Sequence, residues 1–146
     1  MDLDELIARE AIRDLVARYN ANADSGRFAQ VLELFAPDAV MEIPGARHDG
    51  REAIGAMFRS VRERVEDSAT EGARSHLRHF TATLQIDVDD ADHAHSRCYF
   101  AVLMPQGLDH WGRYVDDFVR IDGEWKFARR RVDTEGRREA GSVFDD

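Results

Sequence analysis

Residues 2–24 read DLDELIAREAIRDLVARYNANAD and run into the dipeptide Ser25-Gly26. Apolar side chains recur here at steps of three and four residues, the spacing that presents one stripe of an α-helix to a core. They are Ala8, Ile12, Leu15, Val16, Tyr19 and Ala23. Asp2 and Glu5 have the spacing of a helix-capping box. The pattern predicts an amphipathic helix over 2–24 against which the rest of the chain packs.

The following third of the chain predicts shorter elements and a second long helix. The expected bounds are 28–35 for a short helix, 39–43 for a strand and 47–50 for a weakly indicated hairpin arm. Asp49 and Glu52 then repeat the capping spacing ahead of a helix whose apolar residues again trace one face. These are Ile54, Met57, Phe58, Val61 and Val65. The polar run 66–75 predicts a loop after this helix.

The second half of the chain alternates polar and apolar residues with period two, which is typical of strands. Four such segments cover 78–88, 93–104, 111–121 and 125–133. The turns between them are short, and Asp122-Gly123 is a strong hairpin signal, so an antiparallel meander is expected. Helices followed by such a sheet predict one α+β domain over 1–134, with a polar tail over 135–146. A curved sheet wrapped on helices leaves a conical pocket for a ligand.

Composition limits the class of partner. The chain has 146 residues, a formal net charge of -9 and one cysteine, Cys98. The negative charge argues against nucleic acid or an anionic membrane, because both would repel the protein, and a small hydrophobic substrate is expected instead. The longest apolar run, 99–104, is too short to cross a bilayer, and the acidic first residues lack the basic region of a signal peptide. A soluble, cytoplasmic protein is expected.

Three residues suggest more than a structural role: Asp24 at the expected helix end, Tyr19 on the buried stripe and His79 at the start of a strand. Each also has an ordinary interpretation. Asp24 could cap the second helix, Tyr19 could be core, and His79 could be a satisfied strand histidine. Strict alternation groups His79 with the polar residues of its strand. Either that polar row lines a pocket, or a bulge switches the faces of the strand.

Helix geometry adds a condition to a shared site. Five residues of a regular helix turn by about 140°, so Tyr19 and Asp24 share a pocket only if the helix ends or bends between residues 20 and 25. Asn20, Asn22, Ser25 and Gly26 favour turns or caps, so the local sequence allows such an end.

The order of these elements, with several short motifs, resembles the SnoaL-like branch of the nuclear transport factor 2-like superfamily over about residues 3–132. The motifs are Ile12 to Tyr19 with Asp24-Ser25-Gly26, Leu34 to Val40, Gly50 to Ile54, His79, Gly112-Arg113-Tyr114 and Asp122 to Arg129. The resemblance implies a cystatin-like α+β barrel with a conical pocket. Within the superfamily, the Tyr19, Asp24 and His79 set looks most like scytalone dehydratase, bile acid 7α-dehydratase and hexachlorocyclohexane dehydrochlorinase. These enzymes pair an Asp from the helix end with a His from a strand start.

The chemistry of the residues gives this set its expected roles. Histidine suits a base at neutral pH, since its ordinary pKa of about 6.5 leaves much of it neutral. We therefore expect His79 to remove a proton from carbon, Asp24 to orient its ring, and Tyr19 to donate a hydrogen bond to a carbonyl or leaving oxygen. The expected activity is a cofactor-independent lyase of dehydratase type, or an isomerase, acting on a small cyclic substrate such as a steroid, terpenoid or polyketide. Polyketide cyclisation and a non-catalytic ligand-binding or subunit role remain alternatives.

Other candidate residues give weaker signals. Arg129 and Arg131 point the same way from the last strand and are expected to reach an anionic or carbonyl group of the substrate, although a solvated edge is also typical of such a run. Two histidine pairs lack further ligands at metal-binding spacing, so no metal site is predicted. These pairs are His76 with His79 and His93 with His95. The sequence has no Gly-rich phosphate loop or serine-nucleophile motif, so no cofactor is expected.

The resemblance also implies a homodimer or homotrimer, because members of the superfamily usually associate through the outer face of the sheet. Aromatic strand residues could supply that surface, and they are Tyr99, Trp111, Tyr114 and Phe118. Alternation along the strands requires half of them to face inward instead.

Overall fold

The computed structural model describes residues 1–67 and 77–139. Over these residues the elements are α1 Leu3–Asp24, α2 Phe28–Glu33, β1 Phe35–Ile43, β2 Ala46–Asp49, α3 Gly50–Asp67, β3 Arg78–Val88, β4 His93–Met104, β5 Gly107–Ile121 and β6 Glu124–Arg137. Most of the predicted loop 66–75 and the end of the predicted tail, 140–146, lie outside the described residues. Within the described part, no helix has the length and apolar character that crossing a membrane requires.

The local predictions hold for the long elements. Asp2 caps α1, with the backbone N–H of Glu5 donating to its Oδ1 at 2.9 Å. The bounds of β3 and β4 are those that the sequence predicts. β5 begins at Gly107 rather than at residue 111, and β6 continues to Arg137, past the predicted domain end at residue 134. These two strands therefore form a longer ribbon than the alternation of polar and apolar residues indicates.

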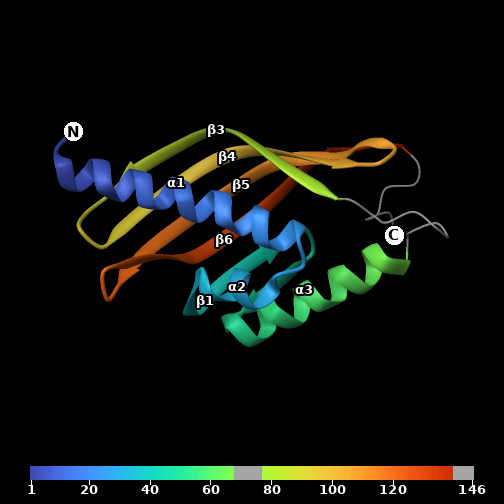
Figure 1. Ribbon diagram of the computed structural model, residues 1–146, viewed down its shortest axis with the longest axis horizontal. Helices are drawn as coiled ribbons and strands as arrows, with labels where there is room; N and C mark the ends of the chain where they lie inside the picture. The colour runs from blue at the N-terminus through green and yellow to red at the C-terminus, as the bar shows by residue number, and fades with distance from the viewer. Residues whose placement is uncertain (68–76, 140–146) are drawn as a thin grey trace.

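The strands form one curved sheet in the order β2-β1-β6-β5-β4-β3. Neighbouring strands are antiparallel, except that β1 runs parallel to β6, a pairing that the sequence did not predict. The sheet is not closed into a barrel, since β2 and β3 are its two edges. α1 runs along one face of the sheet, and α3 lies beside β1 and β2 (Figure 1). The fold is thus the predicted α+β class, with helices on the concave side of an open sheet.

The core is centred on the apolar stripe of α1, where Ile12 and Val16 are almost fully buried. Tyr19, farther along the same stripe, is 4% exposed. Its ring lies 5.7–6.2 Å, between centroids, from four other aromatic rings of the core. These belong to Phe35, Phe58, Tyr114 and Phe127. The stripe therefore joins α1 to α3 and to three strands of the sheet.

A buried ion pair lies at the centre of this aromatic cluster. Arg130 Nε and Nη2 donate to the two carboxylate oxygens of Asp116 at 2.8 and 2.9 Å, and both side chains are fully buried. The guanidinium carbon lies 3.8 Å from the ring centroid of Tyr114 and 4.2 Å from that of Tyr19. Aromatic faces attract a cation at such distances. The ring contacts therefore add to the ion pair in offsetting the free-energy cost of burying the Arg130 charge.

Replacing Arg130 with Met should lower the free energy of unfolding by about 3–5 kcal/mol, because Asp116 would stay buried without its partner. Urea denaturation measures the change. Arg129→Met is the matched control, since Arg129 pairs with Glu42 on the outer face and is 42% exposed. That control should change the free energy of unfolding by less than about 1 kcal/mol. Equal losses in the two variants would contradict a stabilising role for the buried pair.

Candidate active site

Asp24 is the last residue of α1, and its carboxylate points toward β3 rather than back onto the chain. The N-cap position of α2 is Arg27, whose side chain makes no capping hydrogen bond in the described structure. The interpretation of Asp24 as the cap of the second helix is therefore wrong. α1 remains helical through Asp24, so an earlier end or bend of the helix is not what brings Tyr19 and Asp24 to one cavity.

Asp24 and His79 make two hydrogen bonds with each other. His79 Nδ1 lies 2.7 Å from Asp24 Oδ1, and the backbone N–H of His79 donates to Oδ2 at 2.9 Å. The Asp24 side chain is 8% exposed and that of His79 is 19% exposed. Because a carboxylate only accepts, the contact places a proton on Nδ1 and leaves Nε2 on the other edge of the ring. The arrangement fixes both the tautomer and the orientation of the imidazole.

A bulge in β3 explains how His79 faces inward although its strand looks polar. The register against β4 shifts by one residue between Ala82 and Gln85, and Thr83 has a φ of 56°. Before the bulge His79 lies opposite the fully buried Val102 of β4, and after it Ile86 is the buried residue. Of the two alternatives open for this strand, the bulge is the one observed.

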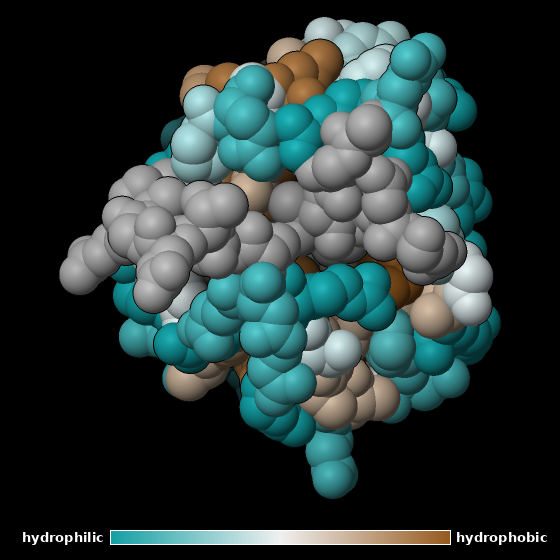
Figure 2. Space-filling view, turned by 90° about the vertical axis from the view of Figure 1, so that its right-hand side faces the viewer, coloured by the Kyte–Doolittle hydropathy of each residue, from teal (hydrophilic) through white to brown (hydrophobic). Residues whose placement is uncertain are grey.

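His79 lines a cavity of about 810 Å³ between α1, α3 and the sheet. Much of its wall is apolar, including Phe28, Met41, Met57, Phe58, Phe100 and Val132. The volume is within the range of small-molecule sites, and such a wall suits an apolar ligand with a few polar groups. Figure 2 looks onto the end of the molecule at which α3 ends, where hydrophilic residues surround smaller hydrophobic areas.

Tyr19 lines the same cavity as Asp24 and His79. Its hydroxyl lies 3.9 Å from Met41 Sδ, which is a weak acceptor. Burial raises the pKa of Tyr19 to about 12. The phenol therefore stays protonated at neutral pH and is available as a hydrogen-bond donor.

Two further polar residues of the cavity were missed by the sequence analysis. Asn20 stands four residues before Asp24, so the two share a face of α1, and this spacing was the available signal. His110 lies on β5, where its Nδ1 is 2.8 Å from Oδ2 of the fully buried Asp109. The strand was predicted to begin at residue 111, so the alternation pattern did not include Asp109 or His110.

His79 and His110 belong to one row across three adjacent strands. Val102 of β4 lies opposite His79 on one side and opposite His110 on the other. Burial lowers the pKa of His110, and the nearby groups His79 and Arg137 lower it further, while Asp109 raises it. The cavity therefore holds two imidazoles, each bonded to its own carboxylate.

Arg129 and Arg131, predicted to bind substrate, do not line the cavity. Arg129 donates to Glu42 and Arg131 to Asp133. Alternation from the buried Phe127 would bring both arginines inward, but the register of β6 against β5 shifts by one residue after Phe127. This bulge turns them to the outer face and buries Arg130 instead, so the prediction is corrected.

No group of three or more His, Cys, Asp or Glu side chains that could hold a metal ion occurs among residues 1–67 and 77–139. His93 and His95 instead pair with carboxylates on the surface, Asp90 and Asp89 respectively. His76, the other histidine weighed as a ligand, lies outside the described residues.

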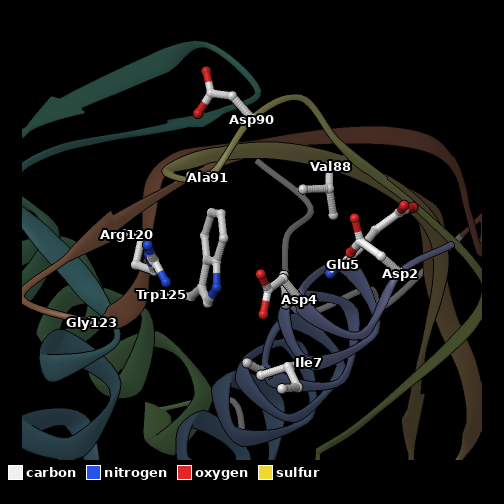
Figure 3. Close-up of a pocket in the computed structure, with 12 residues that line it drawn as sticks. Asp2, Asp4, Glu5, Ile7, Val88, Asp90, Ala91, Arg120, Gly123 and Trp125 are labelled. Carbon is white, nitrogen blue, oxygen red and sulfur yellow. Dashed lines mark hydrogen bonds between the residues drawn. The ribbon is translucent and has the colours of Figure 1, made fainter.

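A second hollow, of about 500 Å³, lies at the other end of α1. Figure 3 shows carboxylates at the start of α1 on one side, those of the N-cap Asp2 and of Asp4 in the first turn, with Trp125 and Arg120 opposite them. Its described lining contains no histidine. The paired acid and base groups are therefore in the larger cavity, which we take as the candidate active site.

An open, curved sheet over helices, with a cavity that holds an Asp–His pair, places the protein in the α+β class. The chain belongs to the SnoaL-like domain family, whose model matches residues 4–131, within the nuclear transport factor 2-like superfamily. No curated protein matches the sequence.

Solved structures share the fold over nearly the whole chain. A scytalone dehydratase-like protein from Novosphingobium aromaticivorans is 20% identical with a TM-score of 0.81, covering 96% of this chain and 92% of that one. The hexachlorocyclohexane dehydrochlorinase LinA-type3 from Novosphingobium barchaimii is 21% identical with a TM-score of 0.78, covering 94% and 93%. An NTF2-like protein with a cystatin-like fold from Novosphingobium aromaticivorans is 26% identical with a TM-score of 0.75, covering 99% and 98%.

The position of His110 leads to a prediction for its titration. Followed by NMR, His110 should lose its proton at a midpoint below the ordinary value of about 6.5. The substitution His79→Asn should raise that midpoint, because it removes a group that repels the charged form. His93→Asn, on the surface, should leave it unchanged. A midpoint at or above the ordinary value in the unsubstituted protein would contradict the burial of this imidazole.

Proposed function

We propose that this protein is a cofactor-independent lyase or isomerase that removes a proton from carbon in a small, mostly hydrophobic cyclic substrate. The observation that carries the proposal is the Asp24–His79 pair within a largely apolar cavity. The SnoaL-like fold, with dehydratase-like and dehydrochlorinase neighbours, supports a dehydratase or isomerase type of family. We propose steroids, terpenoids or polyketides as the substrate types, because the cavity has a volume within the range of small-molecule sites and a largely apolar wall.

In the proposed reaction, the lone pair of His79 Nε2 takes the proton. The electrons of the broken C–H bond form a carbon–carbon double bond. In an elimination the leaving group departs with its bonding pair. Hydroxide takes the proton of the imidazolium to form water, whereas a halide leaves as the anion and the imidazolium gives its proton to solvent water. In an isomerisation a double bond already present in the substrate shifts, and the imidazolium returns the proton to another carbon. His79 is charged after it takes the proton and neutral after it gives the proton up. The enzyme therefore returns to its starting state without a cofactor.

Asp24 supports this step in two ways. Its Oδ1 holds Nδ1 of the ring and stabilises the imidazolium that forms after proton transfer. Its Oδ2 accepts from the backbone N–H of His79, which fixes the carboxylate against the first residues of β3. Tyr19 is the proposed donor to the oxygen that gains charge, because its phenol stays protonated in the cavity wall.

We further propose that the protein forms a homodimer or homotrimer through the outer face of the sheet. Phe80 and Trp111 lie in one row across the strands, on either side of Ala101. Tyr99 and Leu103 flank Ala101 on the same face of β4, and all four large side chains are exposed. Contiguous exposed apolar groups of this kind mark association surfaces.

Half of the aromatic set expected for that surface does face inward. Tyr114 and Phe118 are 2% and 1% exposed, whereas Tyr99 and Trp111 are 54% and 39% exposed. The association surface is therefore proposed on Tyr99 and Trp111 with their apolar neighbours.

The double variant Tyr99→Glu/Trp111→Glu should be a monomer, because it places charge in the proposed contact. Size-exclusion chromatography with light scattering gives the mass. Ile121→Glu is the control, since Ile121 is 37% exposed at the far end of β5 and should not change the mass. A monomeric unsubstituted protein, or a double variant with unchanged mass, would exclude this contact surface.

For the proposed reaction, His79→Asn should lower turnover by about 10²- to 10⁴-fold, the usual contribution of a general base. In the assay, each protein is incubated in D₂O with a panel of cyclic ketones and hydroxylated or halogenated ring compounds. NMR then measures deuterium incorporation at carbon and elimination products. Asp24→Asn should also lower the rate, because the ring loses its orienting carboxylate.

The chain offers a matched control for this assay. His93 lies 3.0 Å from Asp90 on the surface, so His93→Asn removes an Asp–His contact of the same kind outside the cavity. Its activity should equal that of the unsubstituted protein. Turnover that survives His79→Asn would remove the assignment of the base, and ligand binding without any turnover would favour a binding role.

A further inference from the structure

Asn20 has an unused hydrogen-bond donor in the wall of the cavity. The residue is 7% exposed and lines the cavity one helical turn before Asp24. Its Nδ2 is buried and has no hydrogen-bond partner in the described structure. A buried amide nitrogen without an acceptor costs free energy, so such groups are rare in folded proteins and call for an explanation.

Tyr114 determines which way the amide of Asn20 faces. The Tyr114 hydroxyl donates to Asn20 Oδ1 at 3.5 Å. Burial raises the pKa of Tyr114 well above its ordinary value, so the phenol keeps the proton that it donates. The guanidinium of Arg130 stacks on the Tyr114 ring at 3.8 Å and fixes its position. Since the amide oxygen is held by this donor, the amide nitrogen is the group left for a ligand.

We propose that Asn20 Nδ2 donates a hydrogen bond to an oxygen of the substrate, and that this substrate carries a carbonyl group beside the carbon that loses its proton. The inference rests on the proposed function and names its substrate class. Asn20 and Asp24 share one face of α1, and Asp24 holds His79. The donor and the aspartate that orients the base therefore lie one helical turn apart in the wall of one cavity, which suits a substrate oxygen close to the carbon that loses its proton.

Asn20 undergoes no chemical change in the proposed proton abstraction, because it only donates a hydrogen bond. As His79 takes the proton, the C–H pair forms a carbon–carbon double bond and the carbonyl π pair moves to oxygen. The bond from Nδ2 strengthens as that oxygen gains charge, which is the effect of an oxyanion hole. Tyr19, the adjacent residue, is a second donor in the same wall. A halogenated hydrocarbon has no carbonyl oxygen and would leave Nδ2 without an acceptor.

Binding of 1-indanone and indane tests the proposal, since the two probes differ by one carbonyl oxygen. The unsubstituted protein should bind 1-indanone about tenfold more tightly, the upper effect of one neutral hydrogen bond. Asn20→Leu should reduce that preference severalfold, with the remainder supplied by Tyr19, and should leave the affinity for indane unchanged, which also shows that the variant is folded. Asn22→Leu is the control, because Asn22 lies on the same helix outside the cavity lining.

A measurement without substitution checks the same contact. The side-chain amide signals of Asn20 in ¹⁵N NMR should shift with 1-indanone and not with indane. Equal affinities for the two probes, a preference of unchanged size in Asn20→Leu, or amide signals that do not shift with the ketone would each overturn the proposal.

His79→Asn separates this proposal from the function on which it rests. The variant should keep the preference for 1-indanone while losing deuterium exchange at the carbon beside the carbonyl. If the unsubstituted protein shows the preference but no exchange, the proposed reaction fails and the role of Asn20 in binding stands. If exchange depends on His79 but the preference is absent, the role of Asn20 fails and the base assignment stands.

Discussion

The double hydrogen bond between Asp24 and His79 connects residues 55 positions apart, and the geometry of the cavity depends on it. One carboxylate oxygen holds the backbone at the start of β3, and the other holds the imidazole ring. A carboxylate that is 8% exposed needs such partners, because an unpaired charge at this depth would be costly. The contact that joins the end of α1 to the sheet is therefore also the contact that orients the imidazole ring of His79.

The buried Arg130–Asp116 ion pair supports the aromatic side chains of the cavity wall from within the core. Arg130 stacks against the rings of Tyr19 and Tyr114, so one buried cation fixes two of the phenols that border the cavity. Tyr114 in turn holds the amide of Asn20. Core packing and cavity geometry are thus linked, since the buried Arg130 contacts Tyr19 and Tyr114, and Tyr114 contacts Asn20 in the cavity wall. Such support from packed neighbours is what keeps a site in its productive geometry.

The fold by itself leaves the chemistry open. Structures with 20% and 21% identity share almost the whole architecture, and one fold can host different reactions in the same cavity. The apolar wall of this cavity carries a particular set of polar groups: two histidines, each with its own aspartate, and an amide with a free donor in the described structure. The chemistry proposed for the cavity rests on those groups rather than on the sheet that carries them.

The sequence alone determined the helix over 2–24, the bounds of β3 and β4, and the candidates Asp24 and His79, because helical and strand periodicity are local properties. Only the tertiary structure decided which residues of the strands face the cavity. A bulge in β3 allows His79 and Ile86 to point inward together, and a bulge in β6 turns Arg129 outward and buries Arg130. The parallel pairing of β1 with β6 and the site residue His110 were likewise not predicted. The physical reason is that one inserted residue reverses every later side chain of a strand, and its position is set by packing between strands distant in sequence.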